Sequence, residues 1–118
     1  MPLTRVLVVD DHEGFRSAAR ALLESDGLCV VAEAADGARA VAAAARLMPD
    51  LVLLDVHLPD LDGFAVSERM AALPNPPVIV LTSSRPITDL RRRVAACPAA
   101  GFVPKHLLSG AVLLELAG

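Results

Sequence analysis

Short aliphatic runs that end in polar residues recur along the chain, and they constrain its fold more than any other feature. The clearest is LVLLD, residues 51–55, which lies between a Pro-Asp pair and a turn rich in proline, aspartate and glycine. A run this short and apolar predicts a strand that is buried on both faces. Its last residue, Asp55, is charged. We therefore expect Asp55 at the rim of a sheet, where it becomes a candidate site residue.

Similar runs alternate with amphipathic segments through the whole sequence. We expect strands at residues 5–9, 29–34, 51–55, 78–81 and 100–104, and helices at residues 12–25, 36–48, 64–73, 86–96 and 108–117. This alternation with short connections predicts an α/β fold with parallel strands, right-handed crossovers and helices on both faces of the sheet. The mixed run 29–34 is expected near an edge. Gly27 is expected to end the first helix in the left-handed conformation, and Asp62 to cap the third.

Length and composition limit the remaining choices. The 118 residues are expected to form one domain, residues 1–118, with 54% hydrophobic and 21% charged residues. The net charge of −3 predicts no general attraction to nucleic acid or to anionic membranes. No run approaches the roughly 20 apolar residues of a membrane span, and no signal-peptide pattern begins the chain, so we expect a cytoplasmic protein. Cys29 and Cys97 have no metal-binding spacing and are expected to be reduced, buried thiols.

Polar residues follow four of the five predicted strands. Asp10 and Asp11 follow the first strand, Asp55 ends the third, Thr82 follows the fourth, and Lys105 follows the fifth. In a parallel sheet these ends share one edge, where open α/β sheets bind ligands. A polar residue at a single strand end is a weak indication, because polar residues often end strands. Four ends with compatible chemistry indicate a site.

The chemistry of this group favours a divalent cation and a phosphoryl group. Three neighbouring carboxylates cannot all stay ionised without a cation, and an oxygen-rich set suits Mg²⁺, which takes one or two carboxylates together with phosphate oxygens. Zn²⁺ is less favoured, because His12 and His57 come with no thiolate. A carboxylate beside Mg²⁺ can attack a phosphoryl group and form an aspartyl phosphate. A lysine and a threonine hydroxyl would stabilise the transferred group.

Taken together, these motifs resemble the receiver domain of two-component response regulators over essentially the whole chain. Residues 10–12 (DDH) and Arg16 are most similar to the NarL/FixJ-type branch, and residues 55–63 (DVHLPDLDG) match the family's turn after the third strand. The resemblance implies a five-stranded parallel sheet of order 2-1-3-4-5 flanked by five helices, the receiver or flavodoxin-like fold. No glycine-rich phosphate loop follows the first strand, which argues against a dinucleotide-binding fold.

The resemblance also implies a role for each residue at the predicted edge. Asp55 is the implied phosphoacceptor. Asp11 and Asp55 would bind Mg²⁺ directly, Asp10 through water, and His57 through its backbone carbonyl.

Three further residues carry implied roles in phosphoryl binding and switching. Thr82 would hydrogen-bond the phosphoryl group, Lys105 would pair with it, and Phe102 falls at the switch-aromatic position, where it is also suited to the core. Receivers often have Lys-Pro after the fifth strand with a cis peptide bond. This chain has Pro104-Lys105-His106 instead. We expect trans peptide bonds there, because a cis bond without proline costs about 2.5–4 kcal/mol.

The resemblance implies a signalling switch, not a turnover enzyme. A histidine kinase or a small phosphodonor would phosphorylate the chain, and the surface of the fourth helix, fifth strand and fifth helix would then contact an output protein, a C-terminal DNA-binding domain or a second copy. Residues 91–93 (RRR) are expected to form a solvated helix face. A surface that binds a partner is the second interpretation. Two alternatives are a phosphate-independent pseudo-receiver and a small aspartate-nucleophile phosphatase. The phosphatase is disfavoured because its D-x-D pair would follow the first strand.

Overall fold

A computed structural model describes residues 3–86, 88 and 90–118 of the chain. Within these residues the strands are β1 (Arg5–Val9), β2 (Cys29–Ala34), β3 (Leu51–Asp55), β4 (Val78–Ser83) and β5 (Gly101–Pro104). The helices are α1 (Glu13–Ser25), α2 (Gly37–Leu47), α3 (Gly63–Ala71), α4 (Arg91–Ala96) and α5 (Gly110–Ala117), with a short 3-10 helix, η2 (Lys105–Leu107), before α5. The strands pair in parallel in the order β2-β1-β3-β4-β5, which confirms the predicted receiver fold.

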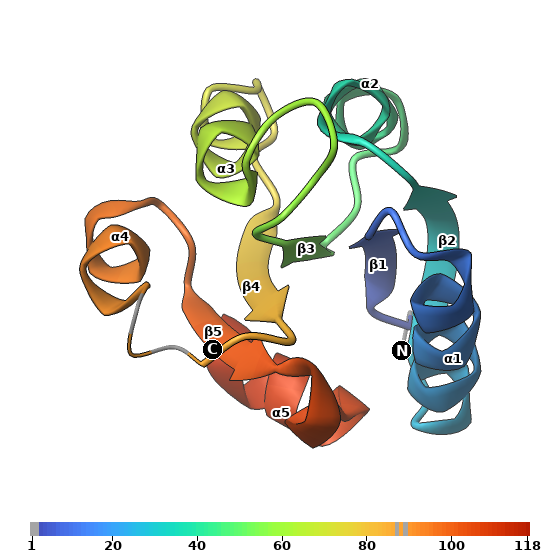
Figure 1. Ribbon diagram of the computed structural model, residues 1–118. Coiled ribbons are helices and arrows are strands. Elements are labelled where there is room, and N and C mark those ends of the chain that lie inside the picture. Colours follow the sequence, from blue (N-terminus) through green and yellow to red (C-terminus); the bar gives the residue numbers. More distant parts are fainter. Residues whose placement is uncertain (1–2, 87, 89) are drawn as a thin grey trace.

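The helices cover both faces of the sheet (Figure 1). Alternate side chains of each strand point to opposite faces, so Leu7 and Leu54 pack under α2, α3 and α4, whereas Val8 and Leu53 pack under α1 and α5. β3 is buried along its whole length, as its aliphatic run predicts. β1 leads to α1 on one face and β3 leads to α3 on the other. The crevice between the carboxyl ends of β1 and β3 is therefore the place where such a sheet binds ligands.

The predicted edge strand and helix caps are confirmed. β2 lies at one end of the sheet. Gly27 has a φ of 91°, the left-handed conformation that favours glycine after a helix. The Asp62 side chain accepts a hydrogen bond of 2.8 Å from the backbone N–H of Ala65 at the start of α3.

The last third of the chain differs from the sequence prediction in two places. α5 begins at Gly110 and not at residue 108, because Ser109 caps it by accepting a 3.1 Å hydrogen bond from the Val112 N–H. α4 begins at Arg91 and not near residue 86; residues 87 and 89 of the predicted helix lie outside the described residues. Before this helix, the Ser83 hydroxyl accepts a 3.0 Å bond from the Arg85 N–H, a local turn that competes with helix formation. No peptide bond in the described part of the chain is cis, as expected around residue 105.

Two expectations for individual side chains need correction. Cys29 and Cys97 are free thiols, but each is only partly buried. The arginine run 91–93 is not a uniform solvated face. Arg93 Nη2 donates a 2.7 Å hydrogen bond to Asp62 Oδ2, and its guanidinium lies 4.1 Å from the centroid of the Phe64 ring. Arg93 therefore joins α4 to the start of α3, although its side chain is exposed, as are those of Arg91 and Arg92.

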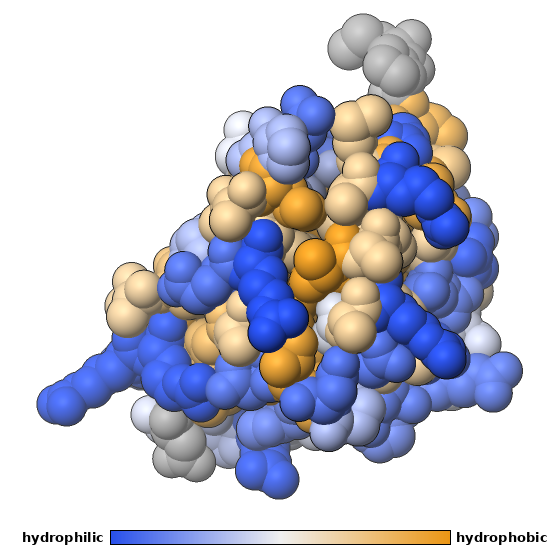
Figure 2. Space-filling model, turned by 90° about the horizontal axis from the view of Figure 1, so that it is seen from above, coloured by the Kyte–Doolittle hydropathy of each residue, from blue (hydrophilic) through white to orange (hydrophobic). Residues whose placement is uncertain are grey.

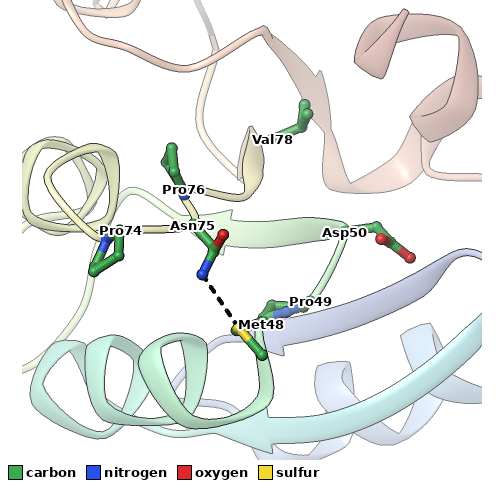
Figure 3. A pocket seen from close by; sticks show the side chains of 7 residues that line it. All are labelled: Met48, Pro49, Asp50, Pro74, Asn75, Pro76 and Val78. Carbon is green, nitrogen blue, oxygen red and sulfur yellow. Dashed lines mark hydrogen bonds between the residues drawn. The ribbon is translucent and has the colours of Figure 1, made fainter.

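A pocket of about 490 Å³ lies at the amino edge of the sheet, where β3 and β4 begin (Figure 3). It is lined by Met48, Pro49, Asp50, Pro74, Asn75, Pro76 and Val78. Met48 ends α2 with a φ of 48°, and its sulfur lies 3.4 Å from the Asn75 side-chain nitrogen. This pocket is at the opposite edge from the predicted site.

The surface over α2 and α3 mixes apolar and charged side chains (Figure 2). The large apolar side chains that are exposed elsewhere, such as Leu22 on α1 and Leu114 on α5, come from different elements. None of the helices within the described residues is long and apolar enough to cross a membrane.

Candidate functional site

Polar side chains from four strand ends meet at the carboxyl edge of the sheet. Asp10 directly follows β1, Asp55 ends β3 and Lys105 directly follows β5. Thr82 lies opposite Asp55 in the pairing of β3 with β4. The Lys105 ammonium is 2.6 Å from Asp10 Oδ2 and 2.9 Å from Asp55 Oδ2. The convergence expected from the parallel topology is therefore present.

The two aspartates at this edge are buried and share one cation. The side chain of Asp10 is 0% exposed, that of Asp55 is 5% exposed and that of Lys105 is 16% exposed. The ammonium also lies 4.4 Å from the centroid of the Phe15 ring, a cation–π contact that the sequence reasoning missed. Two carboxylates beside one ammonium leave an excess of negative charge in a site that excludes most water.

This excess of charge alters the acidity of all three groups. Burial raises the pKa of the Asp55 carboxyl, and the neighbouring Asp10 carboxyl raises it further. Burial also opposes the ionisation of Asp10, but hydrogen bonds from Asp55, Lys105 and the His12 N–H outweigh it and lower the pKa of Asp10. Burial alone would lower the pKa of Lys105, but its contacts with the two aspartates raise it. A further cation at this edge would therefore reduce the repulsion between the Asp10 and Asp55 carboxylates.

The residues around Asp10 provide the donor set of a divalent-cation site. One ligand atom from each of Asp10, Asp11, His12 and Asp55 lies within 4.8 Å of the others. Within the described residues no hydrogen-bond donor is aligned on the buried Asp10 Oδ2, although the Lys105 ammonium lies at ion-pairing distance. A set of carboxylates that outnumbers its single ammonium fits the preferences of Mg²⁺.

His12 has a simpler explanation than metal binding. Its Nδ1 lies 3.1 Å from Asp10 Oδ1 and 3.0 Å from Asp11 Oδ1, and its side chain is 72% exposed. In the tautomer with a hydrogen on Nδ1, His12 donates to Asp10 Oδ1 at the rim of the site. His12 is therefore assigned as a hydrogen-bond donor.

Local backbone bonds hold the two buried carboxylates in place. The His12 N–H donates to Asp10 Oδ1 and the His57 N–H donates to Asp55 Oδ1, each at 2.8 Å. In both cases the donor lies two residues after the acid, the geometry of an Asx turn. The same device therefore orients the acid after β1 and the acid at the end of β3.

The loop after Asp55 folds back against its own start. The Gly63 N–H donates a 2.9 Å bond to the Val56 carbonyl. A Cβ at Gly63 would lie 2.5 Å from the Asp55 carbonyl oxygen and 2.7 Å from the Val56 Cα, so only glycine fits here. α3 therefore begins in contact with the backbone of Asp55.

Asp60 anchors the far side of the same loop to α2. Its carboxylate accepts hydrogen bonds from the backbone N–H groups of Gly37 at 2.8 Å and Ala38 at 3.0 Å. These bonds lower the pKa of Asp60, as expected for a carboxylate at a helix N-terminus. No local signal in the sequence indicates this contact, because the partners are more than twenty residues apart.

Thr82 and Phe102 lie close to the acidic pair in the sheet but have partners of their own. Thr82 is fully buried, and its hydroxyl donates a 2.7 Å hydrogen bond to the Val103 carbonyl on β5. Phe102 is half-buried and packs against the core under α2, α3 and α4. The His57 side chain, two residues after Asp55, is exposed. For Thr82 to contact a ligand at Asp55, its hydroxyl must leave the Val103 carbonyl.

Comparison with known proteins is consistent with this geometry. The model of the response regulator receiver domain family matches residues 6–116. The Bordetella pertussis transcription regulator BvgA is 37% identical over 102 residues, which are 86% of this chain and 49% of that protein. A protein-glutamate methylesterase/protein-glutamine glutaminase of Symbiobacterium thermophilum is 40% identical over 95% of this chain and 31% of its own length. The chain thus spans about half the length of BvgA and about a third of the length of the methylesterase.

Solved structures show the same relationship. The receiver domain of the response regulator NarL from Mycobacterium tuberculosis superimposes with a TM-score of 0.89 and 32% identity, over 99% of this chain and 98% of that one. A two-component response regulator of the LuxR family from an Aurantimonas species gives a TM-score of 0.84 and 28% identity, over 97% of this chain and 81% of that one. With nearly the whole chain matched by the family model and the strand order in agreement, the chain belongs to the response regulator receiver domains.

Proposed function

We propose that this receiver domain is a phosphorylation-driven switch in which Asp55 accepts a phosphoryl group from a histidine kinase or a small phosphodonor. The observation that carries the proposal is the position of Asp55. Its carboxylate lies at the end of a fully buried strand, 2.9 Å from the Lys105 ammonium and inside the acidic cluster with Asp10 and Asp11. A nucleophile, a counter-charge and a cation site are thus within reach of one another.

Mg²⁺ is the cofactor that this cluster suits best. The carboxylates of Asp11 and Asp55 and the backbone carbonyl of His57 would bind it directly, and Asp10 would act through water. Bound there, the ion would supply positive charge against the oxygens of the transferred group. The raised pKa of Asp55 supports this assignment, since burial and the neighbouring Asp10 carboxyl both disfavour a further negative charge there.

The chain's own residues would perform the transfer. A carboxylate oxygen of Asp55 attacks the phosphorus; a new O–P bond forms, and the bond from phosphorus to the donor's nitrogen or oxygen breaks, with its electron pair leaving on the donor. The Lys105 ammonium, already on Asp55 Oδ2, would pair with an oxygen of the new phosphoryl group. Because Lys105 also contacts Asp10, it would stay at the site while its partner changes.

Switching would begin at the hydrogen bond between Thr82 and Val103. When the Thr82 hydroxyl turns to the phosphoryl group, the Val103 carbonyl loses a 2.7 Å donor and β5 can readjust. Phe102, next to Val103 and only half-buried, would change its packing with it. Both arrangements exist before phosphorylation, and phosphorylation shifts the balance by its differential interaction energy.

The surface of α4, β5 and α5 would transmit the change to a partner. Arg91 and Arg92 on α4 and Leu114 on α5 are exposed there. BvgA is a transcription regulator about twice the length of the region that matches. A DNA-binding domain in the same protein, a separate output protein or a second copy of this domain would each be served by this surface.

The proposal is tested by phosphorylation of Asp55 variants with acetyl phosphate and Mg²⁺, read by intact-protein mass spectrometry. Wild type is expected to gain one acid-labile phosphoryl group, and Asp55→Asn none. Asp36→Asn is the matched control, because Asp36 caps α2 away from the cluster and asparagine also caps helices. Labelling of Asp55→Asn equal to wild type would overturn the assignment.

The same proteins separate the proposal from a phosphate-independent interaction module. Beryllofluoride with Mg²⁺ mimics a phosphoryl group on a carboxylate. Wild type should show NMR shift changes that extend from Asp55 to Phe102. A module that switches without phosphate would bind neither Mg²⁺ nor beryllofluoride, and its spectrum would not change.

A further inference from the structure

Arg16, on the first turn of α1, contacts the backbone of the acidic site and not its carboxylates. Its Nη1 donates a 2.6 Å hydrogen bond to the carbonyl oxygen of Asp10. Its Nε donates a 3.2 Å bond to Glu33 Oε1 on the edge strand β2. The side chain is only 15% exposed. One planar guanidinium thus joins the loop after β1 to β2.

We propose that Arg16 is a positioning residue that holds the peptide between Asp10 and Asp11 in the orientation that binds a divalent cation. This inference rests on the cation site of the proposed function. The bonded carbonyl belongs to that peptide, so its orientation sets where the Asp11 Cα and carboxylate lie. Asp11 needs this help, because its side chain is partly exposed and pairs, among the described residues, only with the 72% exposed His12 side chain.

The anchor on the other side of Arg16 is itself held. Arg20 Nε donates a 2.8 Å bond to Glu33 Oε2, and Arg20 Nη1 donates a 3.0 Å bond to the Val30 carbonyl. Each carboxylate oxygen of Glu33 is therefore bonded by a different arginine. Arg20 holds the Glu33 carboxylate in place as the anchor for Arg16. The Asp10 N–H also donates a 3.0 Å bond to the Ala34 carbonyl on β2. The backbone of Asp10 is thus tied to the edge strand through its N–H directly and through its C=O by way of Arg16.

Lysine cannot replace this geometry, although it keeps the charge. A guanidinium reaches two acceptors in one plane, whereas an ammonium is a single point of contact. Outer groups that orient metal ligands typically change metal affinity by about ten- to a hundred-fold when they are replaced. Arg16→Lys should therefore weaken cation binding without changing the net charge of the site.

The test compares Arg16→Lys with Arg20→Lys. Both arginines bind Glu33 and one backbone carbonyl, but only Arg16 binds the carbonyl of Asp10. We expect Arg16→Lys to raise the Kd for Mg²⁺, measured by ¹⁵N NMR titration, about ten-fold, and Arg20→Lys to leave it near the wild-type value. The rate of Asp55 labelling at saturating Mg²⁺ should stay close to wild type in both. A purely structural role would lower the melting temperature of both variants alike and leave the Kd unchanged.

A Kd for Arg16→Lys equal to that of Arg20→Lys overturns the proposal. If Arg16→Lys does not fold, Glu33→Gln gives the answer, because it removes the charge that anchors the guanidinium without altering the loop. Its control is Glu24→Gln, which removes the same charge from α1. An increase in Kd with Glu33→Gln only is expected, and an equal effect of the two overturns the inference. If wild type binds Mg²⁺ but takes up no phosphoryl group, the proposed function fails while the comparison of arginines still stands. If wild type binds no Mg²⁺, both fail.

Discussion

The two edges of the sheet use aspartate in opposite ways. At the amino edge, Asp50 Oδ2 accepts a 2.8 Å bond from the Arg5 N–H, and the Asp50 N–H donates a 2.9 Å bond to the Arg5 carbonyl. The Asp50 carbonyl also accepts a 3.1 Å bond from the Val78 N–H. At the carboxyl edge, Asp10 and Asp55 are buried beside each other with one ammonium between them. The first arrangement stabilises the fold, whereas the second leaves two buried carboxylates to share one counter-charge.

The pocket and the charged cluster lie at opposite edges of the sheet. The pocket of about 490 Å³ in Figure 3 lies at the amino edge, where prolines and backbone caps form its wall. The carboxyl edge has the perturbed carboxyl groups, the shared lysine and the metal-binding donor set. Crowded charge therefore locates the site in this domain, and the presence of a hollow does not.

The largest expected effect comes from removing the shared cation at the carboxyl edge. Lys105→Met should lower the free energy of unfolding by about 3–5 kcal/mol at neutral pH, because two buried carboxylates lose their counter-charge. Without the ammonium the pKa of both carboxyls rises, so the variant becomes less stable as pH rises through those values. The deficit should shrink as pH falls through those raised values, because the carboxyls of the variant are then protonated and need no counter-charge. Urea unfolding across pH measures it, and a deficit that stays constant with pH would contradict the charge explanation.

Adding a cation should change the free energy of unfolding slightly less, and this change should depend only on residues at the carboxyl edge. Mg²⁺ at a hundred times its Kd should stabilise wild type by about 2.7 kcal/mol, since it binds the folded chain and not the unfolded one. Asp11→Asn should lose most of this gain. Asp50→Asn removes the same charge from the amino edge and should keep all of it. Thermal unfolding with and without Mg²⁺ distinguishes the two variants, and equal losses would mean that the ion acts on overall charge.

The smallest expected effect is at the amino edge. Asp50→Ala removes the acceptor for the Arg5 N–H and should cost about 1 kcal/mol of folding free energy. Asp50→Asn should cost less, because its amide oxygen can still accept. Labelling of Asp55 by acetyl phosphate should be unchanged in both variants. A drop in labelling would show that the two edges are energetically coupled.

Much of this architecture could be predicted from the sequence, because periodicity is local. The alternation of aliphatic runs with amphipathic segments predicts parallel strands, and the parallel topology alone brings residues 10, 55, 82 and 105 to one edge. The strand order itself follows from the family resemblance. The caps at Gly27 and Asp62 also follow from residue type. These predictions need no knowledge of which side chains meet.

Contacts between distant residues could not be predicted in this way. Arg16 bridges α1 to β2, Asp60 caps a helix more than twenty residues away, and Arg93 reaches Asp62 from α4. A charged residue on an amphipathic helix is usually interpreted as solvent-exposed. No local pattern therefore indicates that Arg93, and not Arg92, bonds to Asp62. The hydrogen bond from Thr82 to Val103 is hidden for the same reason, since it depends on the register between β4 and β5.

Because Asp60 ties the loop after β3 to the first backbone N–H groups of α2, the loop is ordered before any ligand arrives. Ordering a backbone costs about 1–2 kcal/mol per residue in conformational entropy. For the loop after β3, this free energy is lost when the domain folds and not when a ligand binds. A cation or phosphodonor that reaches the carboxyl edge therefore meets a preformed surface and loses little affinity to loop ordering. The speed of the response would then depend on how often a donor arrives and how well its charge is matched.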